Sequence, residues 1–133
     1  MNQPITHWMF APLRKFATFG GRAPRAEFWW FWLFSVLLIG AATVVDFALI
    51  GAEALAAFGV GPLGGLAALA LMLPSLAVQV RRLHDQEKSG WFILIGLIPF
   101  IGGLILFWFN LQRGTPGTNI YGEDPLETRQ FFT

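Results

Sequence analysis

The chain has 133 residues, of which 55% are hydrophobic and only 13% are Asp, Glu, Lys or Arg. This balance excludes an ordinary water-soluble domain, because a chain of this length has too little interior to bury so much apolar surface. The formal net charge is +1 and there is no cysteine, which excludes disulfides and thiolate chemistry. We therefore expect an all-α integral membrane protein that forms a single membrane domain over residues 1–133.

The N-terminal segment, residues 1–27, is expected to lie at the cytoplasmic membrane interface as a short amphipathic helix. Apolar residues recur in it at near-helical spacing, with basic residues on other faces, and Pro12 limits the helix length. The basic residues either attract anionic headgroups or only set the topology. The apolar positions are Ile5, Met9, Leu13 and Phe16, and the basic ones are Arg14 and Lys15.

Three apolar segments follow, at residues 28–50, 60–80 and 91–110. Each reaches the length of about 20 residues that a helix needs to cross a hydrocarbon core of about 30 Å. We expect three transmembrane helices. The first segment is too long for the apolar region of a signal peptide, so it is expected to remain in the mature chain as an anchor.

Two details of these segments carry structural predictions. Asp46 is the only acidic residue inside them, and its distance from the start of the first segment places it near the outer boundary, where we expect it to reach interfacial water. Gly61 and Gly65 form a small-residue motif that predicts close packing against another helix or another subunit.

The distribution of positive charge predicts the orientation, because Lys and Arg beside a membrane helix are retained in the cytoplasm. Residues 1–27 and 81–90 are basic, whereas residues 51–59 contain Glu53 and no basic residue. The N-terminus and residues 81–90 are therefore expected in the cytoplasm. With three full crossings, the tail, residues 111–133, lies on the outer side.

The third apolar segment allows a second interpretation. Pro99 and the pair Gly102 and Gly103 lie at its middle, where they can divide it into two half-helices that re-enter and return the tail to the cytoplasm. We prefer a full crossing, because a proline in a membrane helix ordinarily only kinks it.

The polar connection between the second and third segments is the best candidate site. Arg81 and Arg82 can clamp a phosphate or carboxylate, with His84 exchanging a proton and Asp85 orienting it. In the alternative, the arginines pair with Asp85 or Glu87, and the histidine only lies at the interface. The basic turn before the first span adds Arg22 and Arg25, which bind lipid phosphate or pair with Glu27 or Asp85. The candidate anionic-ligand or lipid-headgroup site comprises Arg81, Arg82, His84, Asp85, Arg22 and Arg25.

No catalytic constellation is evident. The chain's two histidines, His7 and His84, are too few for a zinc site, and neither a serine-nucleophile elbow nor a phosphate-binding loop is present. So few cationic residues argue against nucleic-acid binding. We expect no catalytic residue, metal or cofactor.

The tail contains a stretch rich in Gly and Pro, residues 114–125, which predicts irregular structure. This stretch can cap the helix ends, with Tyr121 at headgroup level and Glu123 and Asp124 offered to an arginine. If it is cytoplasmic, all the polar parts of the chain converge on one face.

Three sequence blocks are FGGRAPRAEFWW at 19–30, LPSLAVQVRRLHDQEKSGWF at 73–92 and GTPGTNIYGEDP at 114–125. In this order they resemble domain-of-unknown-function family 805 of small bacterial inner-membrane proteins. Phe92 stands where a second tryptophan is usual, and Gln86 and Glu87 replace a small residue and a glycine. The matching positions are Gly21, Arg22, Arg25, Glu27, Phe28, Trp29, Pro74, Arg81, Arg82, Leu83, His84, Asp85, Ser89, Gly90, Trp91, Gly114, Thr115, Pro116, Gly117, Asn119, Tyr121, Gly122, Asp124 and Pro125.

The resemblance implies a multi-pass protein of the bacterial inner membrane without an established reaction. We expect an accessory, scaffolding or lipid-interacting subunit whose partners are membrane lipids and a larger membrane complex or other copies of itself. The alternative is a small homo-oligomeric transporter or lipid-handling protein that uses the arginine-rich connection as an anionic-ligand site.

Overall fold

The computed structural model describes residues 3–126. The chain forms α1 (Ile5–Arg14), α2 (Arg25–Phe58), α3 (Pro62–Asp85), the 3₁₀ helix η1 (Gly90–Leu97) and α4 (Ile101–Leu111). No strand occurs within the described residues, where only an isolated bridge joins Asn119 to Gly122. The all-α expectation is confirmed.

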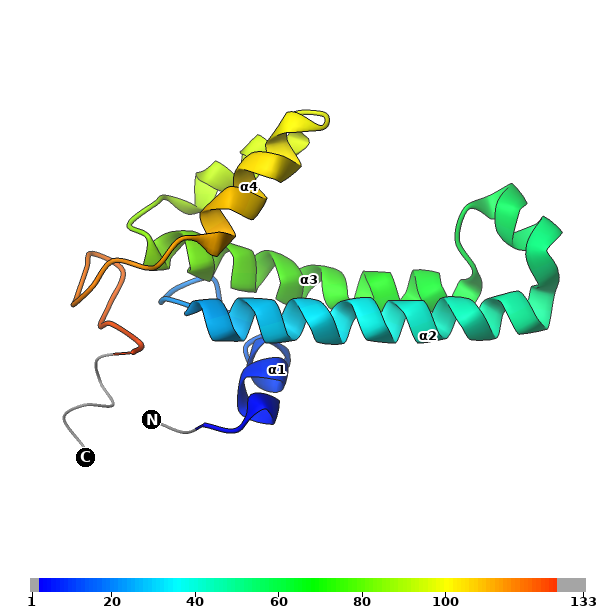
Figure 1. Cartoon of the computed structure of the whole chain (residues 1–133), viewed down its shortest axis with the longest axis horizontal. Coiled ribbons are helices and arrows are strands. Elements are labelled where there is room, and N and C mark those ends of the chain that lie inside the picture. Colours follow the sequence, from blue (N-terminus) through cyan, green and yellow to red (C-terminus); the bar gives the residue numbers. More distant parts are fainter. Residues whose placement is uncertain (1–2, 127–133) are drawn as a thin grey trace.

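The long helices α2 and α3 lie side by side and antiparallel (Figure 1). Both are long and apolar enough to cross a membrane. α2 contains a sharp turn at Gly51, whose φ of 81° is readily adopted by glycine, and its last part, residues 52–58, points away from the helix pair (Figure 1). α3 is longer than the predicted span 60–80 and continues through Asp85, so the arginine-rich segment belongs largely to its last turn.

Asp46 joins α2 to the first turn of α3. Its carboxylate accepts hydrogen bonds from the backbone N–H groups of Leu63 and Gly64, at 3.0 and 2.8 Å, in the first turn of α3. Asp46 is 0% exposed, so the expectation that it reaches interfacial water is wrong. The reason is that the free N–H groups of a helix N-terminus satisfy a carboxylate inside the protein.

Two glycines at the start of α3, Gly61 and Gly64, leave room for the Asp46 side chain between α2 and α3. A Cβ on Gly61 would lie 2.3 Å from the Asp46 carboxyl group, and one on Gly64 would lie 3.1 Å from the Thr43 hydroxyl. The close packing predicted for the small-residue motif therefore occurs at Gly61, against α2 of the same chain, whereas a Cβ on Gly65 would meet only Val60 within 4 Å.

The core between the long helices lies toward their other end, around Phe31, Leu71 and Val78, with Phe28 and Phe34 packed against it. Few residues of the apolar stretches are buried, and most of their large side chains face outward.

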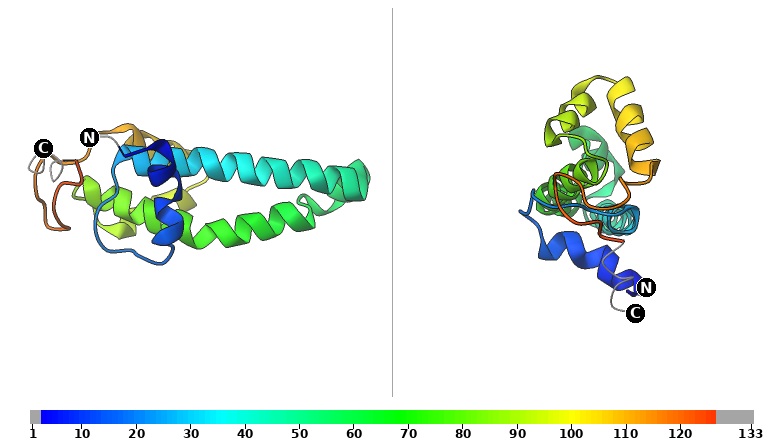
Figure 2. Two further views of the ribbon diagram at one scale, coloured as in Figure 1. Left: turned by 90° about the horizontal axis from the view of Figure 1, so that it is seen from below. Right: turned by 90° about the vertical axis from the view of Figure 1, so that its left-hand side faces the viewer.

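α1 crosses the pair at a large angle, beneath both long helices (Figure 2). The rings of Phe10 and Phe34 meet edge to face with centroids 5.2 Å apart, and Ala11 and Pro12 are buried. The short N-terminal helix predicted from the spacing of apolar residues is present, and it lies across the long helices as an interfacial helix would.

The third apolar segment is not a single helix, and the expected third span over residues 91–110 is not confirmed. η1 and α4 pack against each other as a hairpin with its turn at Pro99 and Phe100 (Figure 1). With 8 and 11 residues, each arm extends roughly 16 Å, about half of a hydrocarbon core. Gly102 explains the break, because a Cβ there would lie 1.8 Å from the carbonyl oxygen of Ile95.

The hairpin returns the chain to the end of α3 from which it started. The N–H of Thr115 donates to the carbonyl of Asp85 at 2.7 Å, so the tail lies beside the arginine-rich end of α3. The preferred arrangement, with the tail on the opposite side from residues 81–90, is therefore wrong for this structure, because the segment between them reverses direction. The alternative with two half-helices describes the observed geometry.

Candidate functional site: a buried arginine cluster

Three parts of the chain meet at the polar end of the helix pair: the last turn of α3, the turn before α2 and the tail. Along α3, Arg81, Arg82 and Asp85 occupy neighbouring positions because residues three and four apart lie on one face of a helix. The N–H of Ala23 donates to the Arg81 carbonyl at 3.0 Å, which holds the turn before α2 against this face.

Asp85 is the centre of the cluster. Its carboxylate accepts from Arg22 Nε at 2.9 Å and from Arg82 Nη1 at 2.7 Å. Arg82 is 0% exposed and Asp85 is 4% exposed, so water screens neither pair effectively.

Arg22 also binds the tail. Its guanidinium donates to the carbonyl oxygens of Thr115 at 2.6 Å and of Gly117 at 2.7 Å. Arg82 likewise donates to the carbonyl of Gln112. The two arginines therefore connect the end of α3 to the segment that follows α4.

Glu27 is the partner of Arg81, at 2.5 Å, and both side chains are buried. This pair joins the first turn of α2 to the last turn of α3. The sequence predicts a ligand, Asp85 or Glu87 as the partner of Arg81, and Arg22 or Arg25 as the partner of Glu27. The observed pair differs from both predictions.

The cluster contains more cations than carboxylates, since three buried arginines face Glu27 and Asp85. Three of their buried nitrogens, Nε and Nη2 of Arg81 and Nε of Arg82, have no hydrogen-bond partner among residues 3–126. An uncompensated buried donor is costly, and an anion is the group that would satisfy these donors best.

Burial is the largest influence on the pKa values of Arg82 and Asp85. It lowers the pKa of Arg82 to about 10, against the attraction of Asp85 and with a further contribution from Arg25. Burial also raises the pKa of the Asp85 carboxyl, against the opposing effects of Arg82 and Arg22. Both shifts indicate that the desolvation penalty of the pair exceeds its mutual attraction, as is common for buried ion pairs.

His84 lies at the margin of the cluster and contacts the tail. Its ring stacks on Tyr121 with centroids 4.0 Å apart and planes 2° apart, and Nδ1 lies 3.1 Å from the carbonyl oxygen of Gly21. Asn119 donates to the His84 carbonyl at 3.0 Å. These contacts place the histidine in packing between the tail and the turn before α2.

Arg25 differs from the other five candidate residues because its side chain is exposed. It donates to the carbonyl of Leu111 at 3.2 Å, and it takes part in none of the ion pairs among residues 3–126. The structure therefore brings the six candidates to one end of the molecule, and among them Arg25 is the exposed arginine.

Two small residues allow the cluster to close. A Cβ on Gly114 would lie 2.0 Å from Asp85 Oδ2, so only glycine fits there without displacement. Gly21 has a φ of 86°, which the turn before α2 requires. Within the part of the chain that the structure describes, no group of three histidine or acidic side chains could hold a metal ion.

The family model described as "Protein of unknown function (DUF805)" matches residues 16–123. The chain belongs to this family. Two curated relatives from Escherichia coli (strain K12) are Inner membrane protein YhaH, 42% identical over 118 residues that cover 89% of this chain and 95% of the relative, and Inner membrane protein YhaI, 40% identical over 118 residues that cover 89% and 94%. No solved structure matches. The resemblance identified from the three sequence blocks is confirmed.

The sequence did not single out the polar contacts between α3 and α4. The amides of Gln79 and Asn110 exchange two hydrogen bonds at 3.1 and 3.0 Å, and Trp29 Nε1 donates to the Asn110 carbonyl at 3.1 Å. A glutamine and an asparagine at the ends of apolar stretches were the available signal, because a polar side chain in such a position needs a partner.

Proposed function

We propose that this protein is a non-catalytic subunit of the bacterial inner membrane that interacts with lipids and scaffolds a larger membrane complex. Its N-terminus, the arginine cluster and the tail lie in the cytoplasm. The inner-membrane location agrees with the names of both relatives, and the orientation follows from the basic residues at this end.

The observation that carries the proposal is the contrast between the two kinds of surface. The charged groups of the buried cluster are paired with one another inside the molecule, whereas apolar side chains such as Val44, Leu49 and Leu69 remain exposed on α2 and α3. Two long helices and a hairpin cannot cover one another. Their outer faces are therefore available to lipid and to the helices of a partner.

The test is cross-linking in intact cells from a photoreactive amino acid placed at exposed positions. Val44 and Leu69 are 68% and 65% exposed on the long helices, and Ile120 in the tail is the control. We expect a discrete protein adduct from the helix positions and none from the control. Release in mild lipid particles should then give a complex larger than the 14.8 kDa chain. A lone monomer without protein adducts at any helix position contradicts the proposal.

A second function is supported by the unpartnered nitrogens of Arg81 and Arg82. In this alternative, the protein is a small homo-oligomeric transporter or lipid-handling protein whose arginine cluster takes an anionic ligand. Its test is binding of inorganic phosphate and of an anionic phospholipid by the purified protein. The Arg82→Ala variant should bind both more weakly at unchanged expression, and unchanged binding excludes this function.

A further inference from the structure

The lateral face between α2, α3 and α4 contains a groove next to the arginine cluster. One cavity of about 230 Å³ lies between α2 and α3, and another of about 270 Å³ lies between these helices and α4. They share Phe28, Trp32 and Gln79 as lining residues, so they are adjoining parts of one groove. Together they are of the size of small-molecule sites.

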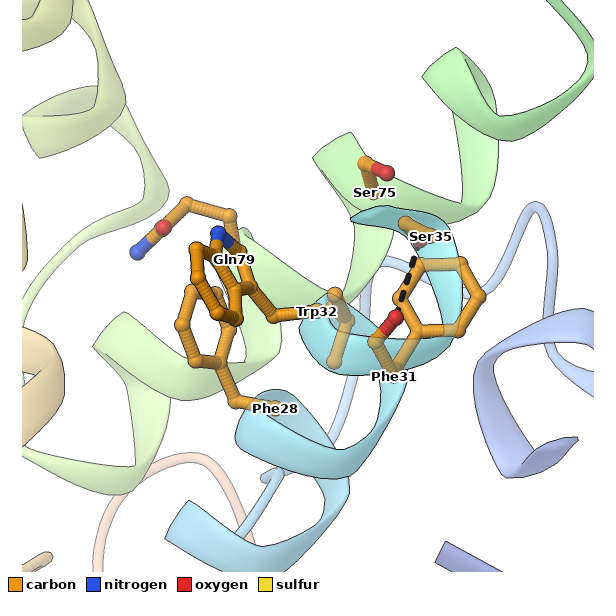
Figure 3. Close-up of a pocket in the computed structure, with 7 residues that line it drawn as sticks. Phe28, Phe31, Trp32, Ser35, Ser75 and Gln79 are labelled. Carbon is orange, nitrogen blue, oxygen red and sulfur yellow. Dashed lines mark hydrogen bonds between the residues drawn. The ribbon is translucent and has the colours of Figure 1, made fainter. Parts of the chain in front are cut away.

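The groove is apolar, and its polar groups are mostly satisfied by one another. Figure 3 shows Phe28, Trp32 and Gln79 close together, with Ser35 and Ser75 farther along the two helices. The Gln79 amide is held by Asn110, and the Ser35 hydroxyl donates to the backbone carbonyl of Phe31 at 2.9 Å. A hydrocarbon chain can therefore lie there without burying these donors unpaired.

The cytoplasmic mouth of the groove is positively charged. Arg25 lies one turn before Trp29 and seven residues before Trp32, which places all three on one face of α2. The carbonyl to which Arg25 donates belongs to Leu111, the residue after the groove-lining Asn110. Arg82 donates to the carbonyl of Gln112, the next residue, so a second, buried guanidinium lies beside this point.

We infer that this groove binds one acyl chain of an anionic phospholipid, whose phosphate lies on Arg25. The inference rests on the proposed function in requiring a lipid-interacting membrane protein, and it names the lipid class and its position. The phospholipid satisfies both halves of the site: the accessible guanidinium pairs with the phosphate, and the chain fills the apolar hollow between the three helices.

The first test fills the groove. Gly103 lines the cavity beside α4, and a Cβ there would meet no atom within 4 Å, so Gly103→Leu places a side chain in the groove without a clash near the backbone. Gly40→Leu is the matched control, since Gly40 is also an exposed helical glycine with nothing within 4 Å, but it does not line the groove.

The readout is native mass spectrometry of the full chain in mild detergent, titrated with phosphatidylglycerol. We expect one retained lipid per chain for the wild type and for Gly40→Leu. Gly103→Leu should bind about tenfold more weakly, the loss that follows from removing roughly ten carbon contacts. Equal affinity of the two leucine variants overturns the inference.

The second test removes the charge. Arg25→Gln should weaken phosphatidylglycerol binding about fivefold and leave phosphatidylcholine binding unchanged, because one arginine near an anionic headgroup contributes about this factor. Lys15→Gln is the control, an exposed cation at the end of α1. An equal effect of both variants overturns the assignment of the phosphate to Arg25.

A third arm separates the lipid from free phosphate. Millimolar inorganic phosphate should not displace phosphatidylglycerol, because the acyl chain contributes part of the binding. Full displacement overturns the inference in favour of a phosphate site. These lipid-binding results can be told apart from a failure of the proposed scaffolding role. Gly103→Leu leaves Val44 and Leu69 unchanged, so the cross-linking test can be carried out separately.

Discussion

Asp85 has two guanidinium partners in a space that excludes water, and this makes it the most sensitive residue of the polar end. The desolvation that raises its pKa and lowers that of Arg82 indicates that the intact group contributes little net stability. Removal of one charged residue from the group should lower the stability of the protein, because the remaining charges stay buried without a counter-ion.

Asp85→Asn is therefore expected to destabilise the protein by roughly 3–5 kcal/mol, since Arg22 and Arg82 lose the carboxylate that they share. The measurement is thermal unfolding of the purified protein in detergent, followed by circular dichroism. Glu123→Gln removes an exposed carboxylate from the tail and should leave the melting temperature unchanged. Equal stability of both variants would show that the cluster is not structural.

Sequence reasoning offered Asp85 as a partner of Arg22 and of Arg82, but it missed the pairing of Arg81 with Glu27. Arg81 pairs with Glu27, which is 54 residues away and comes from the other long helix. The choice among Glu27, Asp85 and Glu87 depends on the register and separation of α2 and α3, and the spacing along one helix contains no information about either. The burial of Asp46 escaped prediction for the same reason, because its donors belong to another element.

Among the elements, the segment at 91–110 illustrates where composition stops being informative. Its apolar residues suit a full crossing and a hairpin equally, so length and hydropathy cannot distinguish them. The hairpin is possible because Gly102 packs closely against the carbonyl of Ile95. This is a contact between η1 and α4, and length and hydropathy do not reveal it. By contrast, α2 and α3 were predictable because their length, composition and flanking charges agree.

Gly102→Ala is expected to open the hairpin and to cost about 1–3 kcal/mol, because the added Cβ overlaps the Ile95 carbonyl oxygen. Gly103→Ala is the matched control in the same helix. It meets open space, so it should leave stability unchanged or raise it by up to about 1 kcal/mol. Thermal unfolding of the two variants in one detergent gives the comparison, and an equal loss in both contradicts the packing described for η1 and α4.

The beginning of α3 offers a second test at this scale. Asp46→Ala leaves two N–H groups of the first turn without an acceptor, and should lower stability by about 1–2 kcal/mol. Glu53→Gln removes an exposed carboxylate from the neighbouring connection and should have no effect. Chemical unfolding in mixed micelles measures both, and an Asp46→Ala protein as stable as the wild type would exclude the capping role.

At the scale of the whole molecule, the arrangement predicts an even number of full crossings with both termini on one side. The absence of cysteine makes this measurable without background, because any introduced cysteine is the only one. Phe58 at the outer end, Ile120 in the tail and Phe100 at the hairpin tip are 77%, 82% and 93% exposed.

A membrane-impermeant maleimide added to intact cells should label Phe58→Cys and should not label Ile120→Cys, which becomes reactive only after permeabilisation. The proposed topology puts the hairpin tip within the bilayer, so Phe100→Cys should stay unlabelled in both conditions. Labelling of Ile120→Cys from outside intact cells would show that the tail lies on the outer side, and would support a third full crossing.

The contacts of Arg22 with the carbonyls of Thr115 and Gly117 also determine when this protein can finish folding. More than 90 residues separate donor and acceptors, so the arginine leaves the ribosome long before its partners are synthesised. α2 and α3 can insert and pair in that interval, with the guanidinium still in water. Closure of the polar end therefore has to wait until Thr115 and Gly117 have been synthesised, after α2 and α3 are complete.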